Sequence, residues 1–219
     1  MAGVAMVAVI VVGIALGNTP DAGASGAKVL QYYSSHHDRQ NAEVLLFGYS
    51  AVFAIVFYAG MASYLRKRGS EILSTLTMVG GAVMAVGLAL GAGTTAVITD
   101  HTSKLSPDAA QALNNVNEDL FFVTLFAGLM IATMAIGISS LRTHAMPKAL
   151  GIVTVVVGVG AVSGIGAWFA FMASGPLTLV LAGYLYQRTG QPASITLPEV
   201  PDQRAAEAPA PARRSRTKA

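Results

Sequence analysis

Long uncharged segments alternate with polar loops along this chain, and the pattern predicts helices that cross a membrane. The clearest segment, Val44–Leu65, contains no Asp, Glu, Lys, Arg or His and is followed directly by Arg66, Lys67 and Arg68. At about 1.5 Å per residue it would extend roughly 33 Å, enough to cross a hydrocarbon core of about 30 Å. The basic triplet marks the end that we expect to face the cytoplasm.

The same pattern predicts an all-α membrane protein with six transmembrane helices in a domain of residues 1–189. The predicted spans cover residues of about 3–17, 44–65, 72–98, 120–141, 149–166 and 169–187. The last two divide one uncharged run, because a single helix over residues 150–187 would be about 57 Å long. Gly, Ser and Pro cluster in this run, so we expect the turn between Gly164 and Gly175, with Trp168 as an interfacial anchor beside it.

The first apolar run has a competing interpretation as a signal peptide. It begins almost at Met1 and is no longer than the apolar core of such a peptide. We favour a membrane span, because a basic amino-terminal region is missing and Gly17–Pro20 is typical of a helix exit. A natural start upstream of Met1 would also explain the short run.

Two polar loops are predicted to carry short extracytoplasmic surface helices, one after the first span and one after the third. Residues 25–34 form the first of these helices, with Val29, Leu30 and Tyr33 on one side. The second begins at Ser106, a good N-cap residue, with Pro107 at the first helical position. Apolar residues then recur at helical spacing into the fourth span.

The distribution of charge predicts the orientation. Six spans place both termini and the loops after the second and fourth spans on one side, which carries 11 of the 14 Lys and Arg residues; the other side carries seven of the 11 Asp and Glu residues. By the positive-inside rule both termini are cytoplasmic, and the protein is a multi-pass protein of the cytoplasmic membrane. Residues 190–219, rich in Pro, Ala and basic residues, are predicted to form a disordered cytoplasmic tail.

Composition agrees with the membrane class. Hydrophobic residues make up 53% of the chain and charged residues 11%, and the mean hydropathy is +0.58. The lipid bilayer is therefore the expected partner. The net charge of +3 is no indication of nucleic-acid binding. The absence of cysteine excludes disulfides and thiolate chemistry.

A weak internal repeat suggests two parallel helix–loop–helix units followed by a hairpin. Residues 12–17 resemble residues 86–91, and each match precedes a polar loop and a further span. The second match contains Gly87 and Gly91, a spacing that lets another helix approach closely. We expect these glycines to pack inside the bundle rather than to form a dimer.

The candidate chemistry lies in the loops, because the predicted spans contain no ionisable group of the kind that proton-coupled carriers use. The candidate metal ligands are His36, His37, Asp38, Asp100, His101, Glu118 and Asp119. If the two loops met, imidazole and carboxylate groups from both would suit zinc with an open position for water. No specific motif accompanies them, so solvated loop residues are the simpler interpretation, and no cofactor is predicted.

Several segments together resemble a known type of protein. The sequences PDAGASGAKVLQYYSSHHDR, SPDAAQALNNVNEDLF and LRTHAMPKALGIV are similar to those of small uncharacterised six-span integral-membrane proteins of actinobacteria, defined by a domain of unknown function. The resemblance implies a bacterial six-helix membrane protein without an assigned activity, and it provides no functional residues. Members of that family usually begin with a longer first span with basic flanks.

Three functions are compatible with this sequence. The first is a non-enzymatic structural or accessory component of the membrane that binds another membrane protein or a second copy of itself. The second is a small facilitator for a neutral or apolar solute, with Thr94, Thr95 and Thr124 along its path. The third is a metal-dependent enzyme that uses the extracytoplasmic loops.

Overall fold

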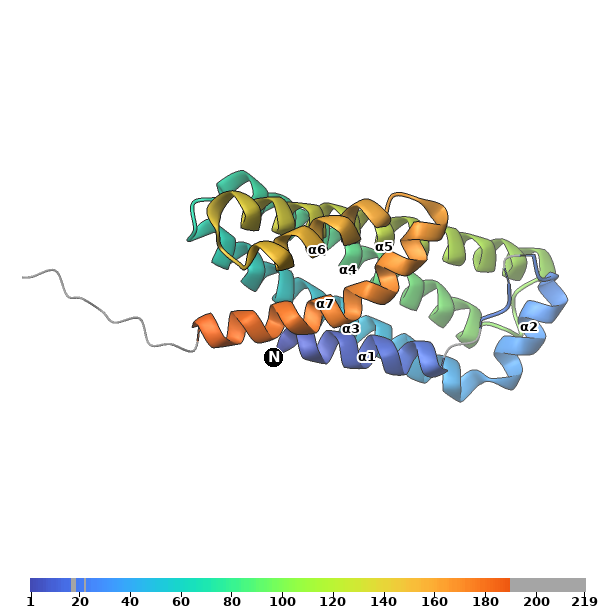
Figure 1. Cartoon of the computed structure of the whole chain (residues 1–219). Coiled ribbons are helices and arrows are strands. Elements are labelled where there is room, and N and C mark those ends of the chain that lie inside the picture. Colours follow the sequence, from blue (N-terminus) through green and yellow to red (C-terminus); the bar gives the residue numbers. More distant parts are fainter. Residues whose placement is uncertain (17–18, 22, 190–219) are drawn as a thin grey trace, which may run out of the picture.

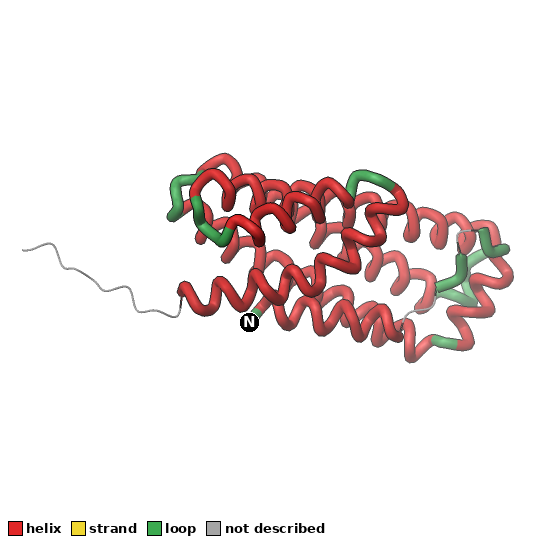
Figure 2. The backbone as a smooth tube through the Cα atoms, in the orientation of Figure 1, coloured by secondary structure: helices red, strands yellow, loops and turns green. Residues whose placement is uncertain are grey.

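The computed structural model describes residues 1–16, 19–21 and 23–189, and this part of the chain consists of helices and connecting loops without strands (Figure 1, Figure 2). The predicted tail of residues 190–219 lies outside the described residues. The helices are α1 (Ala2–Leu16), α2 (Gly26–Ser35), α3 (His37–Arg66), α4 (Glu71–Asp100), α5 (Pro107–Thr143), α6 (Lys148–Gly160) and α7 (Gly164–Thr189). The all-α prediction is confirmed for the described residues.

Four helices, α3, α4, α5 and α7, are long and apolar enough to cross a membrane. Each contains one of the predicted spans. The helices α1 and α6 are also apolar but have only 15 and 13 residues. At about 1.5 Å per residue they extend roughly 20 Å, which is less than the thickness of a typical hydrocarbon core.

Six of the helices form a closed ring. Along the ring, α1 packs against α3, α3 against α4, α4 against α5, α5 against α6, α6 against α7, and α7 returns to α1. The short helix α2 covers one end, where it contacts α5 and α4. The amino terminus and the end of α7 lie together at the opposite end (Figure 1).

The tightest part of the ring is the contact between α4 and α5. A Cβ atom added at Gly80 would lie 2.8 Å from the carbonyl oxygen of Gly128, and one added at Gly128 would lie 2.7 Å from that of Gly80. Gly87 and Gly91 also face α5, where Cβ atoms would meet the side chains of Thr124 and Phe121. The prediction that this glycine pair packs inside the bundle is therefore confirmed.

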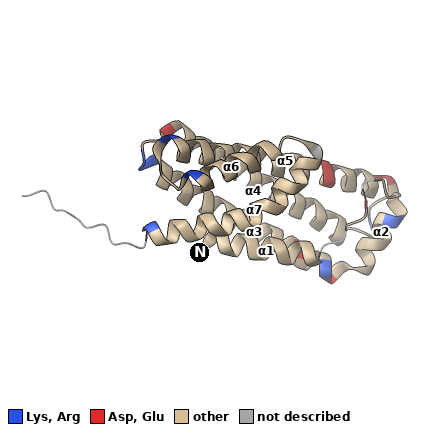
Figure 3. Ribbon diagram, in the orientation of Figure 1, with Lys and Arg blue, Asp and Glu red and all other residues tan. Residues whose placement is uncertain are grey.

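The end of the ring opposite α2 carries most of the described Lys and Arg residues (Figure 3). There α3 ends at Arg66, α5 ends just after Arg142, and α6 begins at Lys148. Asp and Glu residues predominate at the α2 end, where fewer Lys and Arg residues lie (Figure 3). The predicted separation of charge along the bundle is present in the fold.

The predicted turn of the last hairpin is wrong. The chain turns at residues 161–163 and α7 begins at Gly164, so Trp168 lies inside the helix rather than at its turn. Pro176 is accommodated within α7, although it has no N–H to donate to the carbonyl of Met172. The helix bends along its length (Figure 1), as an internal proline explains.

Two loop predictions also need correction. The first loop is shorter than expected, because α3 already begins at His37, seven residues before the apolar run. In the other loop, Ser106 is the predicted N-cap and accepts a hydrogen bond from the amide of Ala109 at 3.2 Å. The helix that it starts continues without a break through the fourth span, so no separate surface helix exists there.

The predicted helix in the first loop is present as α2, but its apolar side does not rest on a membrane surface. Val29 and Tyr33 are fully buried and pack with Ile98 of α4 and Ala110 of α5. Gly26 touches the backbone at Pro107, where a Cβ atom would overlap with the carbonyl group. The two polar loops therefore meet, and α2 closes the end of the bundle.

Candidate binding site inside the helix bundle

A buried stripe runs along α3 and continues beyond its apolar part. Ser50, Ala54, Phe57 and Met61 are buried at three- or four-residue spacing, and the same spacing leads back through Phe47 to two polar residues. These are Glu43, 6% exposed, and Gln40, with no exposed surface. The helical period thus carries a carboxylate and an amide into the interior of the ring.

Three adjoining cavities lie along this interior. A polar cavity of about 230 Å³ lies near the α2 end, an aromatic cavity of about 280 Å³ follows, and an apolar cavity of about 450 Å³ lies beyond it. The aromatic cavity shares Glu43, Phe47 and Trp168 with the polar cavity, and it shares Leu125 and Phe171 with the apolar cavity. The three cavities therefore adjoin in a row, which we call the path, and the polarity of their lining decreases along the bundle.

Carboxylate, amide and hydroxyl groups surround the polar cavity. Its polar lining consists of Glu43, Glu118, Asn114, Asn117, Thr19 and Thr95. The two asparagines are held in place, because Asn117 bonds to the hydroxyls of Thr94 and Thr95, while the Asn114 amide donates to the carbonyl of Pro20 at 3.2 Å. Asn114, Asn117 and Thr95, half of this polar lining, are therefore held in a fixed orientation.

Glu43 is the most deeply buried carboxylate in this lining. Its Oε2 atom is buried and accepts no hydrogen bond of standard geometry within the part of the chain that the structure describes, and both polar atoms of Gln40 also lack one, although the Gln40 amide lies close enough to act on the carboxylate. The guanidinium of Arg39 lies near enough to act on Glu43, and its Nε donates a hydrogen bond to the carbonyl of Leu16 at the end of α1. A buried carboxylate oxygen without a hydrogen-bond donor is costly. A ligand that donates to Glu43 would remove this cost.

Tyr33 of α2 lies near Glu43, at the end of the bundle that α2 covers. Burial, and secondarily the carboxylate of Glu43, raises the pKa of the Tyr33 hydroxyl to about 12. The phenol therefore stays neutral throughout the physiological range. It adds no negative charge to this end of the bundle.

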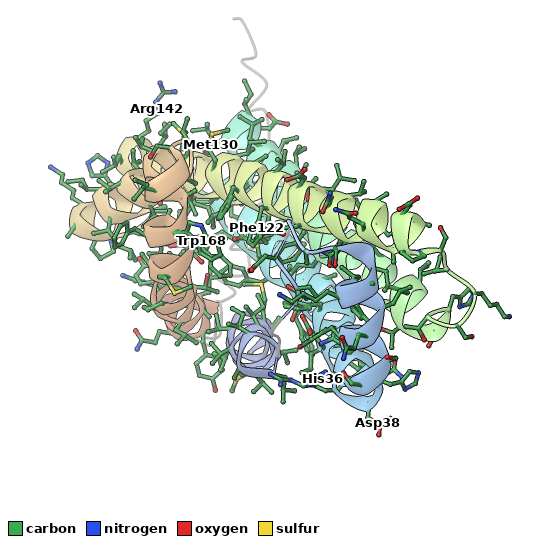
Figure 4. The ribbon with its side chains drawn as sticks, turned by 90° about the vertical axis from the view of Figure 1, so that its right-hand side faces the viewer. His36, Asp38, Phe122, Met130, Arg142 and Trp168 are labelled. Atoms are coloured by element: carbon green, nitrogen blue, oxygen red, sulfur yellow. The ribbon has the colours of Figure 1, made fainter. Side chains whose placement is uncertain are left out.

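Aromatic rings line the space between the polar and the apolar ends of the three cavities, and we call these rings the aromatic wall. Phe47, Phe121, Phe122 and Trp168 line both the polar and the aromatic cavity. The Phe47 and Phe121 rings lie 5.7 Å apart, and Phe122 and Trp168 lie 5.2 Å apart. Figure 4 shows Phe122 and Trp168 on neighbouring helices, close to each other. Three of the ring's helices thus contribute to one aromatic wall.

The apolar cavity lies where α1 and α7 meet the rest of the ring. Met6, Val7, Tyr58, Met84, Phe171 and Pro176 are among the residues that line it. At its rim, Val11 is 57% exposed and Met172 is 56% exposed. The cavity therefore opens on the outer surface of the bundle, beside apolar side chains.

The predicted metal ligands do not come together in the described part of the chain, where no group of three or more His, Asp and Glu residues is arranged to hold a metal ion. Among these candidate ligands, the ion pair between the two loops joins Nε2 of His37 to Oδ1 of Asp100 at 4.0 Å. His36 instead stacks on Tyr32, with ring centroids 4.4 Å apart, and Asp38 is fully exposed (Figure 4).

The remaining predicted metal ligands also lie apart from one another. His101 and Asp119 are exposed, whereas Glu118 lines the polar cavity. Among the threonines predicted to follow a solute path, Thr95 lines the polar cavity. The Thr124 hydroxyl donates to the backbone carbonyls of Leu120 and Phe121 in its own helix.

The residues that the sequence interpretation missed are Gln40, Glu43 and the asparagines at the start of α5. They were assigned to loops because each predicted span began after the last charged residue. The signal that identifies the α3 pair is the continued three- or four-residue spacing of Gln40, Glu43 and Phe47 with the buried stripe.

Comparison of the chain with protein-family models, with curated proteins and with solved structures finds no match. Fold and composition therefore define the class: an all-helical protein, in its described part, with four helices fit to cross a membrane. The resemblance to actinobacterial six-span proteins stays a prediction.

Proposed function

We propose that this chain is a six-span protein of the cytoplasmic membrane that takes up an apolar or weakly polar solute from the bilayer into the interior of its helix ring. The observation that carries this proposal is the apolar cavity of about 450 Å³, whose rim opens on the outside of the bundle between α1 and α7. Its volume lies in the range of sites for drug-sized ligands. In a membrane this opening would face lipid.

The ring supports six spans rather than four. The short helices α1 and α6 each pack between two long apolar helices, so a membrane around the ring would enclose them as well. Their shortness fits local thinning of the bilayer, which costs a fraction of a kcal/mol per Å of mismatch. The cluster of basic side chains at the end that holds both the amino terminus and the end of α7 supports cytoplasmic termini (Figure 3).

A solute explains the cavity better than an association surface does. Protein interiors are close-packed, and an apolar space of this size forfeits dispersion contacts unless something fills it. The accessory role predicted from small-residue spacing draws no support from Gly87 and Gly91, because both are occupied by α5 of the same chain. The apolar cavity therefore favours binding of a solute over a role in association.

The orientation is tested by cysteine labelling, which is convenient because the chain has no cysteine of its own. In intact cells, a membrane-impermeant maleimide should label Lys28→Cys at the α2 end. Lys67→Cys, after α3, should react only when the cells are opened. Labelling of Lys67→Cys in intact cells would contradict the proposed topology.

The binding proposal is tested with Trp168, the single tryptophan of the chain. The purified protein in lipid nanodiscs is titrated with a brominated alkane, which quenches indole fluorescence at short range. Val7→Phe fills the cavity, whereas Val4→Phe makes the same change one turn earlier at a residue that is 45% exposed and outside the cavities.

We expect saturable quenching in the wild type and in Val4→Phe, and at least tenfold weaker apparent affinity in Val7→Phe. Equal, non-saturable quenching in all three proteins would show only partition into the lipid, and it would overturn the proposal.

A further inference from the structure

The polar end of the path has features that the apolar cavity alone does not explain. Two carboxylates, Glu43 and Glu118, line a space of about 230 Å³, and no Lys or Arg is among the described residues that surround it. Four aromatic side chains face the same space. A volume of this size is several times the roughly 30 Å³ that one water molecule occupies in the liquid.

The unpartnered carboxylate indicates what kind of group this space takes. Glu43 is only 6% exposed, lines both the polar and the aromatic cavity, and accepts no hydrogen bond of standard geometry at Oε2 within the described residues. No basic nitrogen of the described residues lies within ion-pair distance of it; the Arg39 guanidinium, whose Nε donates to Leu16, acts on Glu43 from beyond that distance. The described lining of the cavity therefore holds no cation in contact with Glu43, and a bound molecule would supply one.

The aromatic wall selects among cations. Aromatic faces attract cations through the ring quadrupole, and sites made of several rings recognise quaternary ammonium groups, which are large and weakly hydrated. Phe47, Phe121, Phe122 and Trp168 surround the space between the carboxylates and the apolar cavity. A molecule that fills the whole path would place a cationic head at Glu43 and an apolar chain toward Met6 and Val7.

We propose that the ligand of this path is an amphiphilic cation, a quaternary ammonium group that carries an apolar chain. The head lies among Glu43, Glu118 and the aromatic wall, and the chain extends through the aromatic cavity into the apolar one. This inference rests on the proposed function, since it specifies the solute that the cavity takes up. The carboxylate of Glu43 gives the preference for charge, and the apolar cavity gives the affinity for the chain.

The test compares two competitors that differ only in the charge of the head. One is octyltrimethylammonium, and the other is its neutral analogue in which a tert-butyl group replaces trimethylammonium. Each displaces the brominated alkane from the protein in nanodiscs, and recovery of Trp168 fluorescence is measured at equal membrane-bound concentrations. We expect the cation to displace the probe at a concentration about tenfold lower than the neutral analogue.

Variants assign this preference to residues. Glu43→Gln keeps the size of the side chain and should remove most of the tenfold preference, while the neutral analogue still displaces the probe and thereby shows that the variant is folded. Asp119→Asn is the matched control, because Asp119 is exposed and outside the cavities, one residue from Glu118. It should leave the preference unchanged.

The outcomes separate the two proposals. Equal displacement by both competitors would overturn the cation assignment and leave solute binding intact. A preference that survives in Glu43→Gln would contradict the role given to Glu43. Absence of saturable quenching by the brominated alkane in the wild type would instead overturn the proposed function itself, and the cation assignment with it.

Discussion

The contact between α4 and α5 and the contact between α1 and α7 are built in opposite ways. The α4–α5 contact brings the two backbones together at Gly80 and Gly128. The α1–α7 pair borders the apolar cavity, and α7 contains Pro176 at this place. One side of the ring is closely packed and the other borders a cavity, and it is on this second side that we propose a solute enters.

The largest effect should come from crowding the scaffold. Gly80→Leu places a side chain against the backbone of α5, where a Cβ atom alone would lie 2.8 Å from the carbonyl oxygen of Gly128. We expect a loss of about 3 kcal/mol or more in stability, measured by thermal unfolding in detergent. Gly93→Leu, on the same helix but with nothing within 4 Å, is the control and should change stability little. Similar losses in both variants would contradict the comparison.

A smaller effect is expected on the open side. Pro176→Ala restores an N–H for the carbonyl of Met172 and should straighten α7, which changes the wall of the apolar cavity. We expect stability to rise by about 1 kcal/mol while the brominated alkane binds severalfold more weakly. Unchanged binding in the straightened helix would show that the bend has no part in forming the site.

The smallest effect concerns Glu43. Replacing this buried, unpartnered carboxylate with the neutral amide of Gln removes a desolvation cost, so the empty protein should become more stable. A gain of about 1 kcal/mol corresponds to a rise in melting temperature of roughly 2–4 °C for a chain of this length. A lower melting temperature in Glu43→Gln would mean that the carboxylate stabilises the empty fold, and it would contradict the view that Glu43 serves to bind a ligand.

The sequence predicted the scaffold well because the relevant signals are local. Apolar runs longer than a bilayer is thick located the four long helices, and Ser106 with Pro107 located the start of α5. The turn at residues 161–163 was misplaced because Pro176 was interpreted as a breaker, although a helix among packed neighbours tolerates it.

The site was harder to predict for two reasons. The cavities arise where α1, α5 and α7 meet, and no local pattern records such a meeting. Glu43 was missed because the span was started at the first uncharged residue, although its spacing from Ser50 and Ala54 already placed it on the buried face. The three- or four-residue spacing of the buried residues in α3, when it is continued past the first charged residue, identifies Glu43 as buried.

The most direct test of solute uptake between α1 and α7 is a crystal structure. The crystals are grown in lipid with the brominated alkane present, and the anomalous signal locates the bromine. We predict a bromine site inside the ring between α1 and α7, near Met6, Val7 and Phe171. Bromine found only against the outer faces of the long helices, with the space between α1 and α7 closed, would contradict the claim that this side of the ring takes up a solute.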